Sequence, residues 1–461
     1  MGPVRFLSLF LIAAACLAQA PKKPNVLFVL ADDLGASDLG AYGADLHQTP
    51  NLDRFADSAV RFTQSYTASP VCSPTRASIL TGKHPARLHL TIWREAAHNP
   101  PTNRPLLPPR AMDHLPLEEV TLAEVFRAAG YKTAHVGKWH LGTAEYYPQT
   151  QGFDYNVGGT LWGAPQTFFF PYSGDRYFRE PRYVPHLEDG KTGEYLTDRL
   201  TDEALAILDR HRAEPLYLQL WYHTVHTPIE GKPEVAARYQ QKIREGMNHV
   251  NAHYAAMVES LDENFGRLLK RLDELGLADD TIVVFSSDNG GFVNDWQGLP
   301  VTNNAPLRSG KGSLYEGGVR VPTMIRWPGV TRGGVSDEPV SSVDFFPTLL
   351  EMAGLAAPAG VRDGLSLAPL LRDPRAGLDR AALFFHYPHY YPTTSPVSSV
   401  RVGEWKLLEY YEDSRLELYN LVADPSEKSD LAKKEPERAQ AMRARLQEWL
   451  TQVDAQFPLP H

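Results

Sequence analysis

The segment Cys72-Ser73-Pro74-Thr75-Arg76 combines a thiol, a proline and a fixed cation within five residues. Proline is favoured in the first turn of a helix, so the spacing predicts that Cys72 lies at a helix N-terminus. The unpaired N–H groups at such an end attract anions, and Arg76 lies one turn further along the same helix. An isolated cysteine near a helix cap is usually a buried structural residue, but the neighbouring proline and arginine favour a chemical role here.

Four hard oxygen donors form two clusters, Asp32-Asp33 and Asp288-Asn289. Oxygen donors without cysteine or histidine partners suit calcium or magnesium rather than zinc. Adjacent aspartates cannot both stay buried and ionised without a cation beside them. Either pair alone would also fit a solvated turn or a helix cap. Because both clusters follow apolar runs, together they predict one divalent cation site.

Three further residues are suited to bind an anionic substrate. In Gly137-Lys138-Trp139-His140 a cation and an imidazole lie two residues apart, and in an extended segment both would face the same way. Lys311 lies between Gly310 and Gly312, where the backbone can approach a ligand closely. Each lysine alone would fit a solvated side chain. The remaining singled-out histidines are interpreted as ordinary core or loop residues: His135, His223, His249 and His386.

Four of these polar segments follow runs that are predicted to be strands. The continuous apolar run 25–30 is typical of a strand buried on both faces. Shorter runs at 133–136, 216–222 and 281–285 precede the lysine–histidine segment, His226 and the second carboxylate cluster. Ligands of parallel sheets bind beyond the C-terminal ends of the strands, which is where these side chains fall.

Helical patterns alternate with the predicted strands. The clearest runs from Val250 to Leu272, with apolar residues three or four positions apart. Strand–helix alternation predicts an α/β fold with a large, mostly parallel sheet sandwiched by helices. This catalytic domain is expected to cover residues 21–375.

The tail has a different pattern. Short strand-like runs occupy 382–386, 397–402, 405–410 and 416–419, and a helical pattern follows. We therefore predict a C-terminal subdomain, residues 376–461, with a small antiparallel sheet and a helix.

The N-terminus is typical of a signal peptide covering residues 1–20. Arg5 supplies a positive charge, 6–17 is a short apolar run, and Ala18-Gln19-Ala20 fits a cleavage site. The protein is therefore expected to be exported, either to a periplasm or out of the cell. Attachment as a lipoprotein through Cys16 is the less favoured alternative, because Ala13 replaces the usual leucine. After cleavage Cys72 is the single thiol, so no intramolecular disulfide is expected.

Composition narrows the class of protein. The 461 residues are 43% hydrophobic and carry a formal net charge of -9. That balance gives no indication of a nucleic-acid partner, which would normally require a basic surface. No segment after the N-terminal run has about 18 consecutive apolar residues, so no membrane span is expected in the mature chain.

The chain resembles the type I, formylglycine-dependent sulfatases of the alkaline phosphatase superfamily. Their signature, Cys-x-Pro-x-Arg, is matched by Cys72 to Arg76. Other matching motifs follow in the family's order over nearly all of the mature chain. They are Pro24-Asn25-Val26, Asp32-Asp33, Thr81-Gly82, Gly137-Lys138-Trp139-His140, Ser287-Asp288-Asn289-Gly290, Gly310-Lys311-Gly312, Glu316-Gly317-Gly318, Leu418-Tyr419-Asn420-Leu421 and Asp424-Pro425.

The resemblance implies a role for each candidate residue. Cys72 is expected to be oxidised to formylglycine (3-oxoalanine) by a formylglycine-generating enzyme before export. The implied ligands of the cation, usually calcium with magnesium as the alternative, are Asp32, Asp33, Asp288, Asn289 and modified residue 72. The residues implied to hold and activate the aldehyde hydrate are Arg76, Lys138 and His140, and those implied to contact sulfate and the leaving oxygen are His226 and Lys311.

The expected reaction is hydrolysis of sulfate monoesters on a small molecule or saccharide. One hydrate oxygen attacks sulfur, and the second hydroxyl then expels sulfate. Three aspartates and a divalent cation sum to -1, and Arg76, Lys138 and Lys311 raise the total to +2, which attracts an anion. Similarity to bacterial polysaccharide-degrading sulfatases favours a carbohydrate sulfate. Aromatic candidates for sugar contacts are Trp162, 168–170, Tyr172 and the segment 386–391, although core or loop packing is the more common role for each of these residues.

Two other functions stay open at this point. A phosphonate monoester hydrolase or phosphodiesterase could use the same modified cysteine. A degenerate protein could bind sulfate esters without hydrolysing them, although no expected ligand is lost from this sequence. A zinc-dependent phosphatase is disfavoured because the carboxylate clusters lack histidine ligands.

Overall fold

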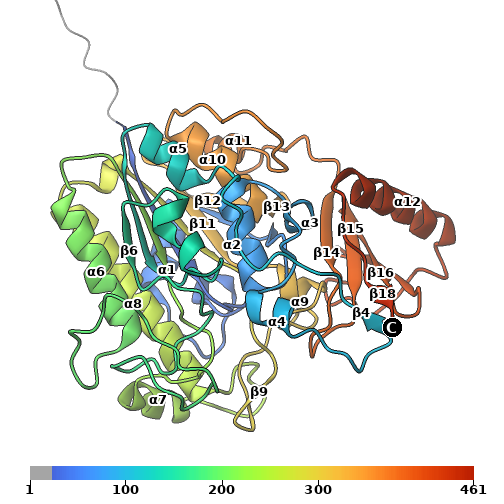
Figure 1. Ribbon diagram of the computed structural model, residues 1–461, viewed down its shortest axis with the longest axis horizontal. Helices are drawn as coiled ribbons and strands as arrows, with labels where there is room; N and C mark the ends of the chain where they lie inside the picture. Colours follow the sequence, from blue (N-terminus) through green and yellow to red (C-terminus); the bar gives the residue numbers. More distant parts are fainter. Residues whose placement is uncertain (1–22) are drawn as a thin grey trace, which may run out of the picture.

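The computed structural model describes residues 23–461 (Figure 1). The predicted signal segment, its cleavage site and Cys16 lie outside these residues. Within residues 23–461, no helix is both long and apolar enough to cross a membrane.

The centre of the molecule is an eight-stranded sheet in the order β12-β2-β11-β8-β1-β7-β5-β6. Its strands are β1 (Asn25–Ala31), β2 (Val60–Phe62), β5 (Lys132–Gly137), β6 (Tyr155–Val157), β7 (Leu216–Trp221), β8 (Thr281–Ser287), β11 (Thr323–Arg326) and β12 (Gly334–Ser336). The five strands from β8 to β6 run parallel, whereas β11 is antiparallel to both of its neighbours. The four strands predicted from apolar runs are therefore β1, β5, β7 and β8, and they lie next to one another.

Helices cover both faces of this sheet, as predicted (Figure 1). Successive side chains of β1 point to opposite faces. Leu27 and Val29 pack in a core with α1 (Pro50–Ser58), α6 (Leu196–Arg210) and α8 (Ala252–Glu274). Phe28 and Leu30 pack in a second core, whose helices are α2 (Cys72–Thr81), α5 (Leu122–Ala128) and α10 (Phe345–Met352). Burial on both faces explains why β1 is apolar at nearly every position.

The longest helix, α8, confirms the periodic pattern but begins later than expected. Asn251 is its N-cap, and the Asn251 side chain accepts a hydrogen bond from the Tyr254 backbone N–H. Val250, predicted as the first residue of the apolar face, lies outside the helix and is 44% exposed. The capping asparagine determines the start, because it satisfies an amide that would otherwise lack a partner.

The C-terminal part forms a four-stranded antiparallel sheet with one helix, as predicted. Its elements are β14 (Leu383–Tyr387), β15 (Val397–Val402), β16 (Trp405–Tyr410), β17 (Leu416–Asn420) and α12 (Pro436–Gln452). One face packs on α12 through Leu407 and Leu446. The other face shares a core with Tyr66 and Val319 of the larger part. The boundary at residue 375 stays a prediction.

Candidate active site

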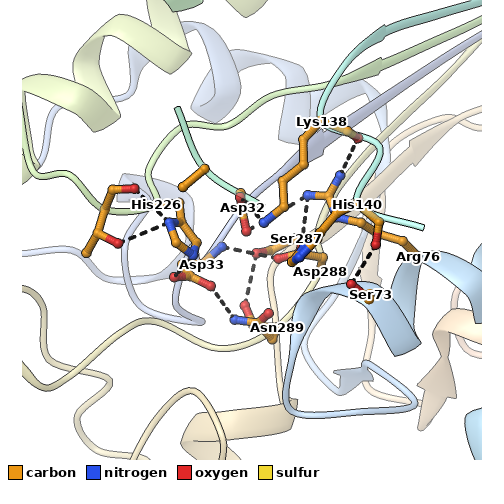
Figure 2. A network of polar contacts seen from close by, with 12 residues as sticks. Asp32, Asp33, Ser73, Arg76, Lys138, His140, His226, Ser287, Asp288 and Asn289 are labelled. Atoms are coloured by element: carbon orange, nitrogen blue, oxygen red, sulfur yellow. Dashed lines mark hydrogen bonds and ion pairs between the residues drawn. The ribbon is translucent and has the colours of Figure 1, made fainter. Parts of the chain in front are cut away.

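The polar segments after the central strands meet at one edge of the sheet (Figure 2). Asp32 and Asp33 follow β1, and Asp288 follows β8. Lys138 follows β5, and His226 lies in the loop after β7. Because these four strands are parallel neighbours, their C-terminal ends bring together side chains up to 256 positions apart in the chain.

Cys72 is the first residue of α2, in the predicted position at a helix N-terminus. The Cys72 side chain is buried, and burial raises the pKa of its thiol. An unmodified thiol in this environment stays protonated and is therefore a weak nucleophile. The position is suited to anion chemistry, but the thiol itself is not.

Two cations are paired with two carboxylates beside Cys72. Arg76 donates through Nε to Asp288 Oδ2 at 2.8 Å, and its Nη2 lies 2.7 Å from the same oxygen. Lys138 Nζ donates to Asp32 Oδ2 at 2.6 Å. All four side chains are fully buried. Burying such charges is tolerated because each has an oppositely charged partner at hydrogen-bond distance.

The third carboxylate, Asp33, contacts the remaining predicted residues. Lys311 Nζ lies 2.9 Å from Asp33 and 3.0 Å from His226 Nε2. Asn289 Nδ2 donates to Asp33 Oδ1 at 2.8 Å. Lys311 reaches this point from a tight loop, since a Cβ at Gly310 would lie 2.3 Å from the Gly291 carbonyl oxygen. The glycine-rich loop therefore brings Lys311 next to Asp33, and its approach to a ligand stays a prediction.

The carboxylates fit a divalent cation. Ligand atoms of Asp32, Asp33 and Asp288 all lie within 4.8 Å of one another. Asp32 Oδ1 and Asn289 Oδ1 are buried and accept no hydrogen bond from the part of the chain that the structure describes. Burial, with the negative charge of Asp288, raises the pKa of Asp32 well above its usual range. Unpartnered oxygens converging beside a carboxylate with a raised pKa are expected where a hard cation binds.

His140 differs from the extended arrangement that its spacing suggested. Its φ of 60° turns the chain, so His140 contacts Glu95 whereas Lys138 contacts Asp32. The distance from His140 Nε2 to Glu95 Oε2 is 3.2 Å. Gly163 permits this position, because a Cβ there would lie 2.3 Å from the imidazole Cε1. The prediction that the two side chains face the same way was wrong in this respect.

A cavity of about 260 Å³ opens onto the site. Five predicted residues line it: Asp33, Cys72, His140, His226 and Lys311. The sequence analysis missed other lining side chains, among them Trp93, Glu95, Phe178, Arg182 and Phe292. They lie in segments distant from the motifs, and no local spacing marks them.

The aromatic candidates for sugar contacts are divided between the cavity and the core. Tyr391 lines the cavity, as the segment 386–391 suggested. Phe168 and Tyr172 are fully buried in the main core instead. Trp162 packs near the Arg182 guanidinium, at 5.4 Å from ring centroid to Cζ. An aromatic residue in an apolar stretch of sequence can pack in the core or face a ligand, and the sequence alone does not distinguish these two positions.

Comparison with known proteins assigns the family. The sulfatase family model matches residues 24–355, and the model for the C-terminal region of N-sulphoglucosamine sulphohydrolase matches 310–456. A sulfatase of Formosa agariphila is 33% identical, covering 95% of this chain and 90% of the relative. Human arylsulfatase A is 32% identical, covering 88% and 78% respectively. The crystal structure of Ps i-CgsB in complex with k-i-k-neocarrahexaose is 28% identical, covers 93% of each chain and has a TM-score of 0.78.

These matches span both the carboxylate-bearing sheet and the C-terminal sheet. The family acts on sulfuric esters, typically with formylglycine and a metal ion, and both requirements agree with the buried cysteine and the acidic cluster. The chain therefore belongs to the sulfatase family of the alkaline phosphatase superfamily and is a sulfuric ester hydrolase.

Proposed function

We propose that this chain hydrolyses sulfate monoesters carried on carbohydrates, with residue 72 converted to formylglycine and one calcium or magnesium ion bound beside it. The observation that carries the proposal is the gathering of paired cations and carboxylates around Cys72, which lines the cavity together with Asp33 and Lys311. The carbohydrate preference is supported by aromatic side chains at the cavity, such as Trp93 and Tyr391, and by the oligosaccharide complex of a structural relative.

The cation would be held by the side chains of Asp32, Asp33, Asp288, Asn289 and modified residue 72. When bound, the cation would polarise sulfate oxygens as a Lewis acid. A hydrated formylglycine would supply a nucleophilic oxygen and a second hydroxyl for release of sulfate. The side chains around the cation and around residue 72 determine how the substrate is oriented and which charges it meets.

Glu95 fixes the tautomer of His140. The Glu95 carboxylate accepts a hydrogen bond from the Nε2–H of His140, with the two atoms 3.2 Å apart. In this neutral tautomer Nδ1 has no proton and can accept one. Nδ1 is buried and has no hydrogen-bond partner among the described residues. Burial lowers the pKa of His140 to about 4, which keeps the ring neutral at pH 7. His140 is therefore suited to act as a base toward residue 72.

Lys311 and His226 are suited to the leaving oxygen. The Thr227 carbonyl oxygen lies 2.8 Å from His226 Nδ1, which places the ring proton there and leaves Nε2 to accept from Lys311. Asp33 keeps the pKa of Lys311 well above its usual range, although burial opposes this. Lys311 thus stays charged and can donate a proton to a departing alkoxide, while His226 holds it in position.

The test is sulfate release by enzyme produced together with a formylglycine-generating enzyme. We expect kcat/KM for a sulfated saccharide or an aryl sulfate to exceed that for the matched phosphonate monoester and phosphate diester by at least about 100-fold. The reverse preference would favour the phosphonate hydrolase alternative. Mass spectrometry of peptide 62–76 should show CH₂SH replaced by CHO at residue 72.

Export before action is a separate part of the proposal. It rests on the charge, apolar run and small-residue site within residues 1–20. N-terminal sequencing of protein recovered from its natural compartment should begin at Pro21. A full-length chain in the cytoplasm would contradict it.

A further inference from the structure

One side chain at the active-site cavity carries a charge that the reaction does not use. Arg182 lines the same cavity as Cys72 and Lys311, and only 11% of its side chain is exposed. The guanidinium is held against aromatic rings, with Cζ 3.6 Å from the Phe178 centroid. This stacking fixes the orientation of the cation and removes water from one of its faces.

Arg182 is poorly paired compared with the catalytic cations. In residues 23–461 its one ion pair is to Glu180 Oε2 at 3.7 Å, and the Glu180 side chain is 52% exposed. Nη1 donates a long bond of 3.4 Å to the Ala164 carbonyl oxygen, and Nε has no partner. Lys311 has its carboxylate at 2.9 Å. Arg182 therefore keeps unused donors beside the substrate cavity.

The neighbouring acid does not supply the missing partner. Glu95 lines the same cavity but is engaged with His140 at 3.2 Å. Burial lowers the pKa of Arg182, and the charges of Glu95 and Glu180 only partly oppose this effect. A buried and incompletely paired guanidinium is unfavourable in the free enzyme, so binding of an anion there is favoured by relief of that penalty.

We infer that Arg182, stacked on Phe178, forms a second anion subsite that recognises a carboxylate or a further sulfate group on the sugar that carries the scissile sulfate. This inference rests on the proposed carbohydrate sulfatase function and narrows its substrate class to saccharides with at least two anionic groups. The planar fork of an arginine matches both anions through paired N–H donors.

The experiment compares kcat/KM for three versions of one sulfated sugar: with no second anion, with a carboxylate and with a second sulfate. We expect the native enzyme to prefer one doubly anionic version by about 10- to 100-fold, the range for a charged hydrogen bond. Arg182→Met should remove most of that preference, because kcat/KM should fall much more for the doubly anionic sugar than for the singly charged one. The carboxylate and sulfate arms distinguish the two anions.

Arg176→Met is the matched control. Arg176 also pairs with a glutamate, Glu230 at 3.4 Å, and packs on a tyrosine, but it is 71% exposed and does not line the cavity. It should keep the native preference. Arg182→Glu should instead favour a sulfated sugar with a free amine, because the sign of the subsite is reversed.

Equal kcat/KM for all three sugars with native enzyme would overturn the subsite, and so would an equal loss on all three with Arg182→Met. If Arg182→Met does not fold, the test is the salt dependence of the native enzyme's preference for the doubly anionic sugar. A preference that shrinks with added salt supports an ionic contact, and one that does not change overturns it. Failure of native enzyme to release sulfate from any of the sugars would overturn the proposed function instead.

Discussion

Two of the buried charge clusters in residues 23–461 differ in an informative way, and one of these two is the candidate site. At the sheet edge, Asp32, Asp33 and Asp288 face Arg76, Lys138 and Lys311. At the joint with the C-terminal sheet, Lys406 Nζ lies 2.8 Å from Glu316 and 3.0 Å from Glu427, and Tyr66 donates to Glu316 at 2.6 Å. Burial and ion pairing are therefore alike in the two clusters.

The two clusters differ in the surroundings of the acceptor oxygens that have no hydrogen bond. At the sheet edge, Asp32 Oδ1 and Asn289 Oδ1 have no hydrogen-bond donor among residues 23–461, and the neighbouring Asp33 and Cys72 line an open cavity. At the joint Glu427 Oε1 also lacks a hydrogen bond, but Lys406 Nζ lies only 3.0 Å from it, and Glu427 Oε2 accepts the Glu316 backbone N–H at 2.7 Å. Neither glutamate lines the active-site cavity. Buried charge alone thus does not indicate a binding site. Unpartnered acceptors next to an open cavity do.

Two of the motifs that match the family have different roles in the structure. Glu316-Gly317-Gly318 was one of the matching motifs, with no role inferred for it. Its glutamate joins the two parts of the chain through Lys406 of the C-terminal sheet, and Tyr66 of the larger part donates a hydrogen bond to it. This motif is structural, whereas Gly310-Lys311-Gly312, which precedes it by a few residues, belongs to the active site.

The largest expected effect is at residue 72. Cys72→Ser, made without a converting enzyme, should lose multiple turnover by at least about 10⁴-fold while keeping the fold, because serine lacks the second hydroxyl that releases sulfate. Intact mass after incubation with substrate should detect any sulfated serine, and Cys72→Ala should give no such adduct. Turnover of the serine variant at the native rate would show that release by the hydrate is wrong.

The next effect concerns the cation. Asp288→Ala should lower kcat by about 10²- to 10³-fold and reduce bound calcium or magnesium, because it removes one of three converging carboxylates. Chelation of the native enzyme should have a similar effect that added calcium reverses. Glu427→Gln is the matched control from the other cluster and should leave metal content unchanged. Unchanged metal and turnover in Asp288→Ala would mean that the site is misassigned.

Substitution of Lys406, in the charge cluster at the joint with the C-terminal sheet, should lower stability and leave catalysis unchanged. Lys406→Met should lower the free energy of unfolding by about 3–5 kcal/mol, because it removes the cation that both buried glutamates share and leaves Glu316 only the longer pair with Arg320 at 3.7 Å. Urea denaturation measures this, with exposed Lys433→Met as the control. A large fall in kcat at unchanged stability would contradict the division between the two clusters.

The smallest expected effect is a pH dependence. Burial and the charge of Glu316 raise the pKa of Glu427 above its ordinary value of 4.5. The folded state therefore holds a proton that the unfolded state has lost. The stabilisation is complete below pH 4.5 and is lost as pH rises through the higher folded pKa. The native-minus-Glu427→Gln difference in unfolding free energy should fall by about 1 kcal/mol or more across this window. A flat difference would contradict the raised pKa.

Much of this site follows from local sequence. Apolar runs located β1, β5, β7 and β8, and the carboxylates and cations follow them directly. Since parallel strands end at one edge of a sheet, the meeting of Asp32 with Asp288 follows once those strands are assigned. Proline spacing located Cys72 at the start of α2. Signal cleavage and the boundary at residue 375 stay predictions.

Tertiary structure decided the contacts that no local pattern encodes. Glu95 reaches His140 from the short helix α4 (Arg94–His98), and Arg182 reaches the cavity from an isolated β-bridge with Gly174. The position of both segments depends on packing. His140 turns away from Lys138 because its backbone adopts a positive φ. Side-chain periodicity reports which face of a strand or helix is buried, so it predicts elements and their ends. It contains no information on which distant loops meet, because that depends on how the whole chain packs.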